Sequence, residues 1–258
     1  MEQITVATYN IRTDTEADGQ WSWKNRQPHV VNLIRYHDWD IFGAQEVQPN
    51  QLADLKALTA YEVAGLARED GLNQGEYTAL FYKKEKFELL KKEAFWLSDT
   101  PDLPSIHPTA GCPRVCVCAF LKSKETGTEF AVATTHLDHI SAESRLFGAQ
   151  IILDHCLSKI SNQPLILMGD FNALPEEATY HLITEHLTDA KQQEGSSFYG
   201  PVGTFQDFAY DRAWEDLEEI DYIFVSDQIN VEKVGVLTDN CNRRYPSDHF
   251  PVVATLHL

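Results

Sequence analysis

Acidic, amide and imidazole side chains gather at the ends of apolar segments at five places along the chain. The runs are Tyr9-Asn10-Ile11-Arg12, Gln45-Glu46-Val47, Thr134-Thr135-His136-Leu137-Asp138-His139, Gly169-Asp170-Phe171-Asn172-Ala173 and Ser247-Asp248-His249. Such groups are costly to bury, and α/β proteins usually build their sites where strands end. Taken singly, each run is also typical of a turn or a helix cap. Five of them in one chain favour a functional site.

These side chains predict the metal-assisted hydrolysis of a phosphate ester. Four of them offer the hard oxygen ligands that suit Mg²⁺ or Mn²⁺: Asn10, Glu46, Asp170 and Asp248. His136 and His249 can move protons or hydrogen-bond a phosphoryl oxygen, and Asp221, on a separate predicted strand, can orient one of the two rings. Together they are the parts of an enzyme that splits a phosphate ester with water.

Apolar patterning predicts the elements that position these runs. Alternating or β-branched apolar segments predict strands over residues 4–9, 40–44, 77–82, 87–96, 115–121, 130–135, 164–168, 220–225, 231–237 and 250–256. Apolar residues at helical spacing predict helices over residues 27–36, 49–58 and 142–160. Proline and glycine predict a loop over residues 98–113.

The order of these elements predicts an α/β sandwich. Strands alternate with helices, yet several strands follow one another directly, which favours antiparallel pairs over an all-parallel Rossmann sheet. No glycine-rich dinucleotide loop or phosphate-binding P-loop is present. Without repeats or a low-complexity linker, we expect one domain over residues 1–258. The five cysteines are odd in number and sparse, so they do not indicate a disulfide framework.

The net charge of the chain argues against some classes of binding partner. The chain of 258 residues carries 39 acidic and 21 basic residues, a formal net charge of −18. Such a chain is a poor candidate for gripping nucleic acid or an anionic membrane by charge alone. No apolar run approaches the ~18–20 residues of a membrane span, and no basic start or long apolar run resembles a signal peptide. We therefore expect a cytoplasmic protein whose partner is a phosphate-ester substrate.

The ordered runs identify a resemblance. The sequence resembles the endonuclease/exonuclease/phosphatase superfamily, the metal-dependent hydrolases with the pancreatic-deoxyribonuclease fold, and specifically a bacterial branch of unassigned substrate. Its motifs occur in family order: Tyr9-Asn10-Ile11-Arg12, Gln45-Glu46, Thr135-His136-Leu137, Gly169-Asp170-Phe171-Asn172, Ile220-Asp221-Tyr222 and Ser247-Asp248-His249-Phe250-Pro251. The resemblance implies a four-layer α/β sandwich. Two mixed, mainly antiparallel sheets pack face to face with helices outside, and the site lies at one mouth of the paired sheets.

The resemblance also implies roles for individual residues. Glu46 would be the main metal ligand, with Asn10 and Asp248 completing or supporting the site. Asp170 would position or deprotonate the attacking water. Asn172 would bind the developing phosphorane oxygens. Both one-metal and two-metal schemes are described for the family, and the sequence does not choose between them.

Histidines and arginines complete the expected site. His249 would contact the scissile phosphate, as a base or an electrostatic stabiliser, with Asp221 holding its ring. His136 would be the second imidazole, on the phosphate or the leaving-group side. The candidates for binding the substrate phosphate are Arg68, Glu76, Arg114 and Arg145. For the arginines, a structural salt bridge is the alternative.

Three functions are compatible with these residues. The first is a Mg²⁺- or Mn²⁺-dependent phosphoesterase acting on a small phosphodiester or phosphomonoester, which the charge of −18 favours. The second is a nuclease for single-stranded nucleic acid, either a 3′-exonuclease like the deadenylase branch or an endonuclease. The third is a non-catalytic binding protein on the same fold, and the intact set of acid, base and metal ligands argues against it.

Overall fold

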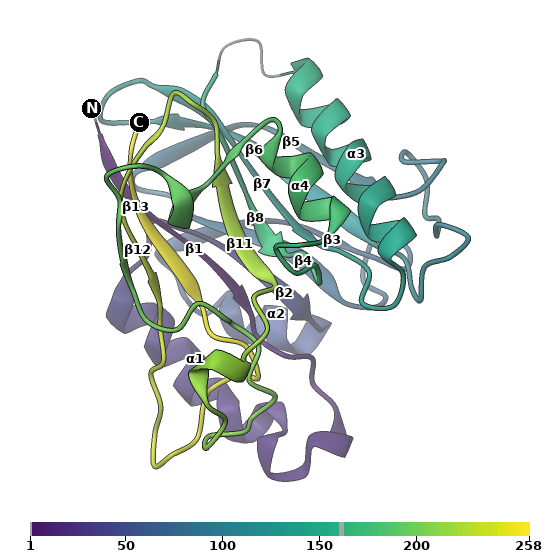
Figure 1. The fold of residues 1–258 in the computed structure, drawn as a ribbon, viewed down its shortest axis with the longest axis vertical. Helices are drawn as coiled ribbons and strands as arrows, with labels where there is room; N and C mark the ends of the chain where they lie inside the picture. The colour runs from purple at the N-terminus through teal and green to yellow at the C-terminus, as the bar shows by residue number, and fades with distance from the viewer. Residues whose placement is uncertain (1, 160–162) are drawn as a thin grey trace.

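The computed structural model describes residues 2–159 and 163–258 as two β-sheets between two layers of helices (Figure 1). The first sheet has the order β10 (Ser197–Tyr199), β12 (Asn230–Val236), β13 (Val252–His257), β1 (Gln3–Asn10), β2 (Ile41–Val47), β4 (Tyr77–Lys83) and β3 (Tyr61–Ala67). The second has the order β5 (Phe87–Trp96), β6 (Val115–Ser123), β7 (Glu129–His136), β8 (Leu165–Asp170), β11 (Asp221–Val225) and β9 (Thr188–Asp189). The predicted sandwich of two mixed sheets is confirmed.

Helices cover the outer face of each sheet, as Figure 1 shows. Helices α1 (Trp23–His37) and α2 (Pro49–Leu55) share an apolar cluster with β1, β2 and β4 of the seven-stranded sheet. Helices α3 (Ala142–Lys159) and α4 (Ala178–Thr184) share another with β6, β7, β8 and β11 of the six-stranded sheet. Among the described residues, no helix is both long and apolar enough to cross a membrane.

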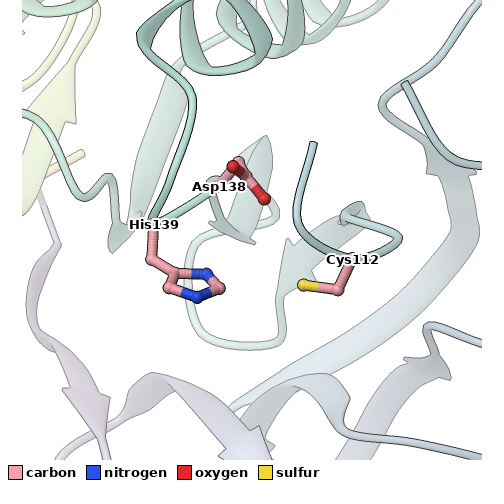
Figure 2. A group of neighbouring side chains, drawn as sticks. All are labelled: Cys112, Asp138 and His139. Atoms are coloured by element: carbon pink, nitrogen blue, oxygen red, sulfur yellow. The ribbon is translucent and has the colours of Figure 1, made fainter. Parts of the chain in front are cut away.

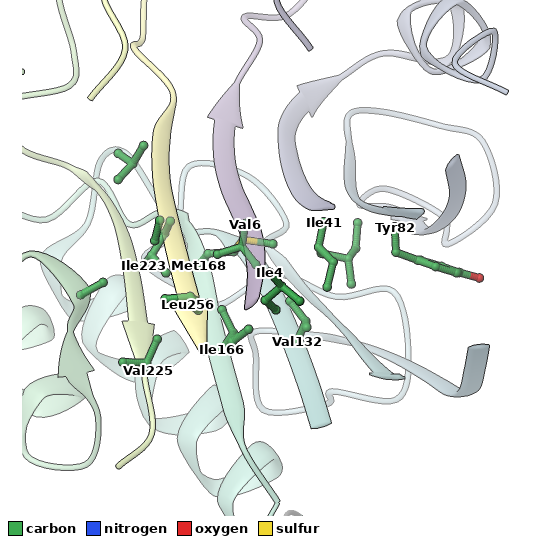
Figure 3. Packing of buried hydrophobic residues seen from close by; sticks show 14 of the residues in the cluster. Ile4, Val6, Ile41, Tyr82, Val132, Ile166, Met168, Ile223, Val225 and Leu256 are labelled. Atoms are coloured by element: carbon green, nitrogen blue, oxygen red, sulfur yellow. The ribbon is translucent and has the colours of Figure 1, made fainter. Parts of the chain in front are cut away.

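A third apolar cluster fills the space between the sheets (Figure 3). Strand side chains point alternately to the two faces of a sheet, so one strand can serve two clusters. In β1, Ile4 and Val6 lie in the cluster between the sheets, whereas Ala7 and Tyr9 face α1 and α2. The sheets approach each other closely at Gly43 of β2, where a side-chain Cβ would lie 2.4 Å from Thr134 Oγ1 of β7.

Two parallel pairs occupy the middle of the sheets and set the position of the site. Strand β1 runs parallel to β2, and β7 runs parallel to β8, whereas most other neighbours are antiparallel. The carboxyl ends of parallel strands meet at the same edge of a sheet. The polar runs that follow these four strands therefore emerge at one end of the sandwich.

The predicted elements differ from the structure mainly at their ends. Helix α1 begins at Trp23 rather than at residue 27, because tertiary contacts hold that turn. The indole of Trp23 donates to Asp54 Oδ2 at 2.8 Å, and its backbone N–H donates to Asp14 Oδ1 at 3.3 Å. Strand β2 continues through the polar run to Val47, and α2 ends at Leu55. Ile160, the predicted end of the third helix, lies outside the described residues.

Candidate active site

Strand register brings the predicted site residues to one level of the sandwich. In the seven-stranded sheet, Asn10 at the end of β1 lies beside Gln45 of β2. In the six-stranded sheet, Asp170 pairs with His136 on one side and with Asp221 on the other. Because Asn10, His136 and Asp170 end their strands and Asp221 begins the antiparallel β11, their side chains meet where the two sheets open.

Glu46 is held at this opening in an unusual backbone conformation. Its φ of 61° lies in the left-handed region, which costs a residue with a side chain roughly 1–2 kcal/mol. Two hydrogen bonds fix its carboxylate, from Asn10 Nδ2 to Oε1 at 3.0 Å and from the Thr13 backbone N–H to Oε2 at 2.9 Å. Burial raises the pKa of Glu46, but these bonds together with the charges of His249 and Arg12 lower it by more. The side chain is therefore kept as a carboxylate.

Asp170 is an almost fully buried acid of the site. Its Oδ2 accepts from Asn10 Nδ2 at 2.9 Å, and its Oδ1 accepts from the Asn172 backbone N–H at 3.0 Å. Burial and the nearby Asp221 raise the pKa of Asp170 to about 7, against the lowering influence of His249. A carboxyl group with a pKa near neutrality is suited to accept a proton from water.

His249 and Asp221 form a buried acid–imidazole pair, as the sequence predicted. His249 Nδ1 lies 2.8 Å from Asp221 Oδ2, and Thr204 Oγ1 donates to the same oxygen at 2.6 Å. Burial lowers the pKa of His249, but Asp221, with Asp170 and Asp248, raises it by more, so that it lies well above its usual range. The other ring nitrogen, Nε2, lies 3.8 Å from Asp170 Oδ2.

His136 and Asn172 flank Asp170 on the other side. His136 Nε2 lies 3.5 Å from Asp170 Oδ2. Burial and the guanidinium of Arg114 lower the pKa of His136 well below its usual range, so this ring is neutral. Asn172 has a left-handed φ of 48°, and its Nδ2 donates to the Leu137 carbonyl at 3.1 Å. Both side chains line the pocket at the mouth of the sheets.

Asp248 completes the acidic set beside an arginine that the site prediction left out. Asp248 Oδ2 lies 3.7 Å from Arg12 NH1, and Ser247 Oγ donates to Asp248 Oδ1 at 3.2 Å. Arg12 also pairs with Asp18 at 3.0 Å. Burial and the charge of Glu46 raise the pKa of Asp248, although His249 acts in the opposite direction.

The buried carboxylates of the site carry more negative charge than the neighbouring cations neutralise. A bound divalent cation would balance that charge. The raised pKa values of Asp170 and Asp248 both report buried negative charge. Glu46 and Asp248 both line the pocket, and their carboxylates are hard oxygen donors that suit Mg²⁺ or Mn²⁺. Asp170, Asp221 and His249 also lie within 4.8 Å of one another. Because His249 already hydrogen-bonds Asp221 and its other ring nitrogen lies 3.8 Å from Asp170, this trio is an acid–imidazole pair next to a second acid, and the residues fit a cation beside Glu46.

A pocket of about 530 Å³ opens above these groups. Of the four predicted phosphate-binding residues, Arg68, Glu76 and Arg114 line it. Arg145 does not: it donates to Glu177 Oε2 at 2.5 Å and to the Asp138 carbonyl at 3.2 Å, which is the structural alternative considered for it. Asn10 also lies beneath the pocket, fully buried, with its amide bridging Glu46 and Asp170.

Sequence reasoning missed several residues of this pocket. Arg12 and His139 stand inside the polar runs, so their positions carried a usable signal. Four others come from loops without a recognisable pattern: Cys112, Phe205, Asp207 and Glu218. Thr204, which positions Asp221, also belongs to such a loop.

Comparison with known proteins identifies the family. A model of the endonuclease/exonuclease/phosphatase family matches residues 7–249. A conserved protein of unknown function from Enterococcus faecalis V583 has a structure 45% identical in sequence, with a TM-score of 0.94 over 98% of this chain and 99% of that one. The mannosyl-6-phosphatase of Bacteroides thetaiotaomicron VPI-5482 is 37% identical, with a TM-score of 0.92 over 99% of this chain and 100% of that one.

Curated sequence relatives include RNA-degrading enzymes. The CCR4-Not complex 3′-5′-exoribonuclease subunit Ccr4 of Aspergillus niger is 24% identical over 97% of this chain and 50% of its own length. The chain thus spans about half the length of the curated relatives that it matches first.

Proposed function

Since the chain belongs to the endonuclease/exonuclease/phosphatase family and is a phosphoric ester hydrolase, we propose that it hydrolyses a small phosphomonoester whose leaving group is a sugar. The pocket is the observation that carries this proposal. Its volume of about 530 Å³ lies in the range of small-molecule sites. Asp207 and Glu218 line it and are exposed, so they would repel the further phosphates of a polynucleotide. We propose that residues 1–258 act as one domain, because both sheets supply this site.

Asp170 is the group that activates water in this proposal. Its carboxylate accepts hydrogen bonds from Asn10 and Asn172, which fix its orientation, and its pKa of about 7 leaves much of it ionised at neutral pH. A water molecule that donates to Asp170 attacks phosphorus, the P–O ester bond breaks, and the sugar oxygen takes a proton from bulk water to leave as the alcohol. The products are inorganic phosphate and the free sugar, and the water proton passes to Asp170.

The remaining side chains of the site stabilise negative charge on the phosphate, bind the leaving group or hold the metal. His249 keeps its proton on the Asp221 side, and the raised pKa makes it an imidazolium that favours negative charge on the phosphoryl oxygens. Asn172 offers its side-chain amide to those oxygens, and neutral His136 offers a hydrogen bond on the leaving-group side. Glu46 and Asp248 would hold Mg²⁺ or Mn²⁺, which polarises a phosphoryl oxygen when bound.

A substrate panel tests the proposal. Phosphate or product release is measured with Mg²⁺ and with Mn²⁺ on hexose 6-phosphates, phenyl phosphate, a phosphodiester, short single-stranded RNA and single-stranded DNA. The highest kcat/KM is expected for a hexose 6-phosphate. A preference of tenfold or more for the phosphodiester or for RNA would refute the proposal. His249→Ala serves as the control, because its loss of turnover assigns the activity to this site.

The second candidate function is a 3′-exonuclease, favoured by the similarity to Ccr4 along 97% of the chain. The net charge of −18 opposes it. The same panel separates the two functions, because an exonuclease releases mononucleotides from the 3′ end of RNA and leaves hexose phosphates intact.

A further inference from the structure

One wall of the catalytic pocket carries a second group of reactive side chains. Cys112, from the loop before β6, faces Asp138 and His139, which follow β7 (Figure 2). One candidate ligand atom from each of the three lies within 4.8 Å of the others, so the trio has the composition of a transition-metal site. Cys112 and His139 line the pocket, whereas Asp138 is buried behind them.

Arg114 excludes a cation from this trio. Its NH2 donates to His139 Nδ1 at 2.9 Å, and its Nε lies 3.7 Å from Asp138 Oδ2. The oxygens of Asp138 are engaged as well: Oδ1 accepts from the backbone N–H groups of Ile140 and Ser141 at 3.0 and 2.8 Å, and Oδ2 accepts from that of Gly111 at 2.9 Å. A guanidinium therefore stands where a metal ion would need to bind.

A second arginine–carboxylate pair lies along the same wall. Arg68 NH1 donates to Glu76 Oε2 at 2.5 Å, and both side chains line the pocket. We call Arg68, Glu76, Cys112, Arg114 and His139 the arginine lobe. Glu46 and His136 border the lobe and also belong to the catalytic group, so the lobe adjoins the reacting phosphate.

The charges of the arginine lobe do not describe a second phosphate site. Arg68 has Glu76 as its carboxylate partner, and Arg114 has Asp138, so the four groups sum formally to zero. A site for a further phosphate would need an excess of positive charge. The lobe instead combines N–H donors with carboxylate and imidazole acceptors. This combination suits sugar hydroxyls, because each hydroxyl both donates and accepts hydrogen bonds.

The lobe also holds donors that the protein leaves unused. Arg114 is only 6% exposed, yet its Nε finds no hydrogen-bond partner among the described residues. The buried Nε of Arg68 also makes no hydrogen bond within the described part of the chain, although it lies 3.5 Å from Glu69 Oε1. Buried donors without a partner are costly unless a ligand or water satisfies part of the group.

We infer that the arginine lobe is the leaving-group subsite, and that Arg114 and Glu76 select a neutral polyhydroxylated alcohol over an apolar or a further phosphorylated one. The inference rests on the proposed function. It changes the predicted role of Arg68, Glu76 and Arg114 from holding the scissile phosphate to holding the sugar hydroxyls.

The experiment compares three substrates with different leaving groups: mannose 6-phosphate, phenyl phosphate, which offers no hydroxyl, and fructose 1,6-bisphosphate, which adds an anion. The measured quantity is the ratio of kcat/KM for mannose 6-phosphate to that for phenyl phosphate. In Arg114→Gln this ratio is expected to fall on the order of tenfold or more, mainly through KM, because hydrogen bonds to a charged donor are lost. Arg145→Gln is the matched control and should retain the wild-type ratio.

Two results would contradict the inference in different ways. If the wild-type enzyme turns over phenyl phosphate but no hexose phosphate, the proposed function fails and the inference fails with it. If mannose 6-phosphate is hydrolysed but Arg114→Gln loses both substrates equally, or if fructose 1,6-bisphosphate is preferred, the inference alone is overturned. If Arg114→Gln does not fold, the same ratio is measured in Glu76→Gln. A wild-type ratio in Glu76→Gln would refute the subsite.

Discussion

Replacing Asp221 with asparagine tests the pair that orients His249. The pair is short and buried: His249 Nδ1 lies 2.8 Å from Asp221 Oδ2, and both side chains are at most 5% exposed. Asparagine preserves the shape of the carboxyl group and the hydrogen bond from Thr204 can persist. The substitution therefore removes the negative charge beside the ring with little change in packing.

The expected loss follows from two effects of that charge. Burial lowers the pKa of His249, and Asp221 raises it more than Asp170 or Asp248 does, so the variant lowers the pKa of the ring and favours its neutral form. An asparagine amide that turns its N–H toward Nδ1 also selects the wrong tautomer. Losses of positioned acid–base groups are ~10²–10⁴-fold. We expect kcat to fall on the order of 10²-fold, which is about 2.7 kcal/mol in the activation free energy.

The assay is a double-mutant cycle with pH profiles of kcat/KM. His249→Ala should cost at least as much as Asp221→Asn, and the double variant little more than His249→Ala, because residues that act as a unit are not additive. An imidazolium that is needed for activity is lost as pH rises through its pKa. In Asp221→Asn the alkaline limb of the profile should therefore move to lower pH.

A matched control separates chemistry from damage to β11. Tyr222 adjoins Asp221, and its hydroxyl donates to the Ala173 carbonyl at 2.9 Å on the face that packs beneath the helices. Tyr222→Phe should lower stability without a comparable loss of kcat. Losses that multiply in the double variant, or an unmoved alkaline limb in Asp221→Asn, would refute the paired action of these two residues.

Three further predictions address packing, pH and charge. Gly43→Ala should lower the free energy of unfolding by about 1–3 kcal/mol in a denaturant titration, because its Cβ would lie 2.4 Å from Thr134 Oγ1; Gly235→Ala, with its nearest neighbour at 3.7 Å, should change it little. Burial raises the pKa of Asp138, but backbone N–H groups and the charge of Arg114 lower it by more. Asp138→Asn should therefore lower the free energy of unfolding at neutral pH. The difference from wild type should shrink as pH falls through the lowered pKa of Asp138. Single-stranded RNA should bind weakly at ~0.15 M salt in fluorescence anisotropy, with a shallow salt dependence; tight, steeply salt-sensitive binding would support the exonuclease instead.

The polar runs predicted the centre of the site because each belongs to a buried strand whose end is clear in the sequence. Asn10, His136 and Asp170 follow apolar β-branched or alternating segments, and strand register then determines that they meet. The pairing of Asp221 with His249 was predictable for the same reason, since each residue flanks a late strand.

Residues on irregular loops could not be placed in this way. Phe205 and Asp207 reach the pocket through isolated bridges and turns, and Asp207 has a left-handed φ of 54° that no local pattern announces. Helix α4 was missed because its seven residues are too few to show a period. The role of Arg145 depended on which partner it meets in space, and only the structure shows Glu177.

The cation beside Glu46 is the central claim, and metal titration of wild type and Glu46→Gln tests it most directly. Mn²⁺ binding is measured by calorimetry without substrate, and hexose 6-phosphate hydrolysis is followed against free Mg²⁺ or Mn²⁺ after chelation. We expect chelator to abolish hydrolysis, either metal to restore it, and Glu46→Gln to bind Mn²⁺ at least tenfold more weakly while its melting temperature stays close to that of wild type. Hydrolysis that persists in chelator, or a Glu46→Gln variant with wild-type metal affinity and activity, would contradict the account.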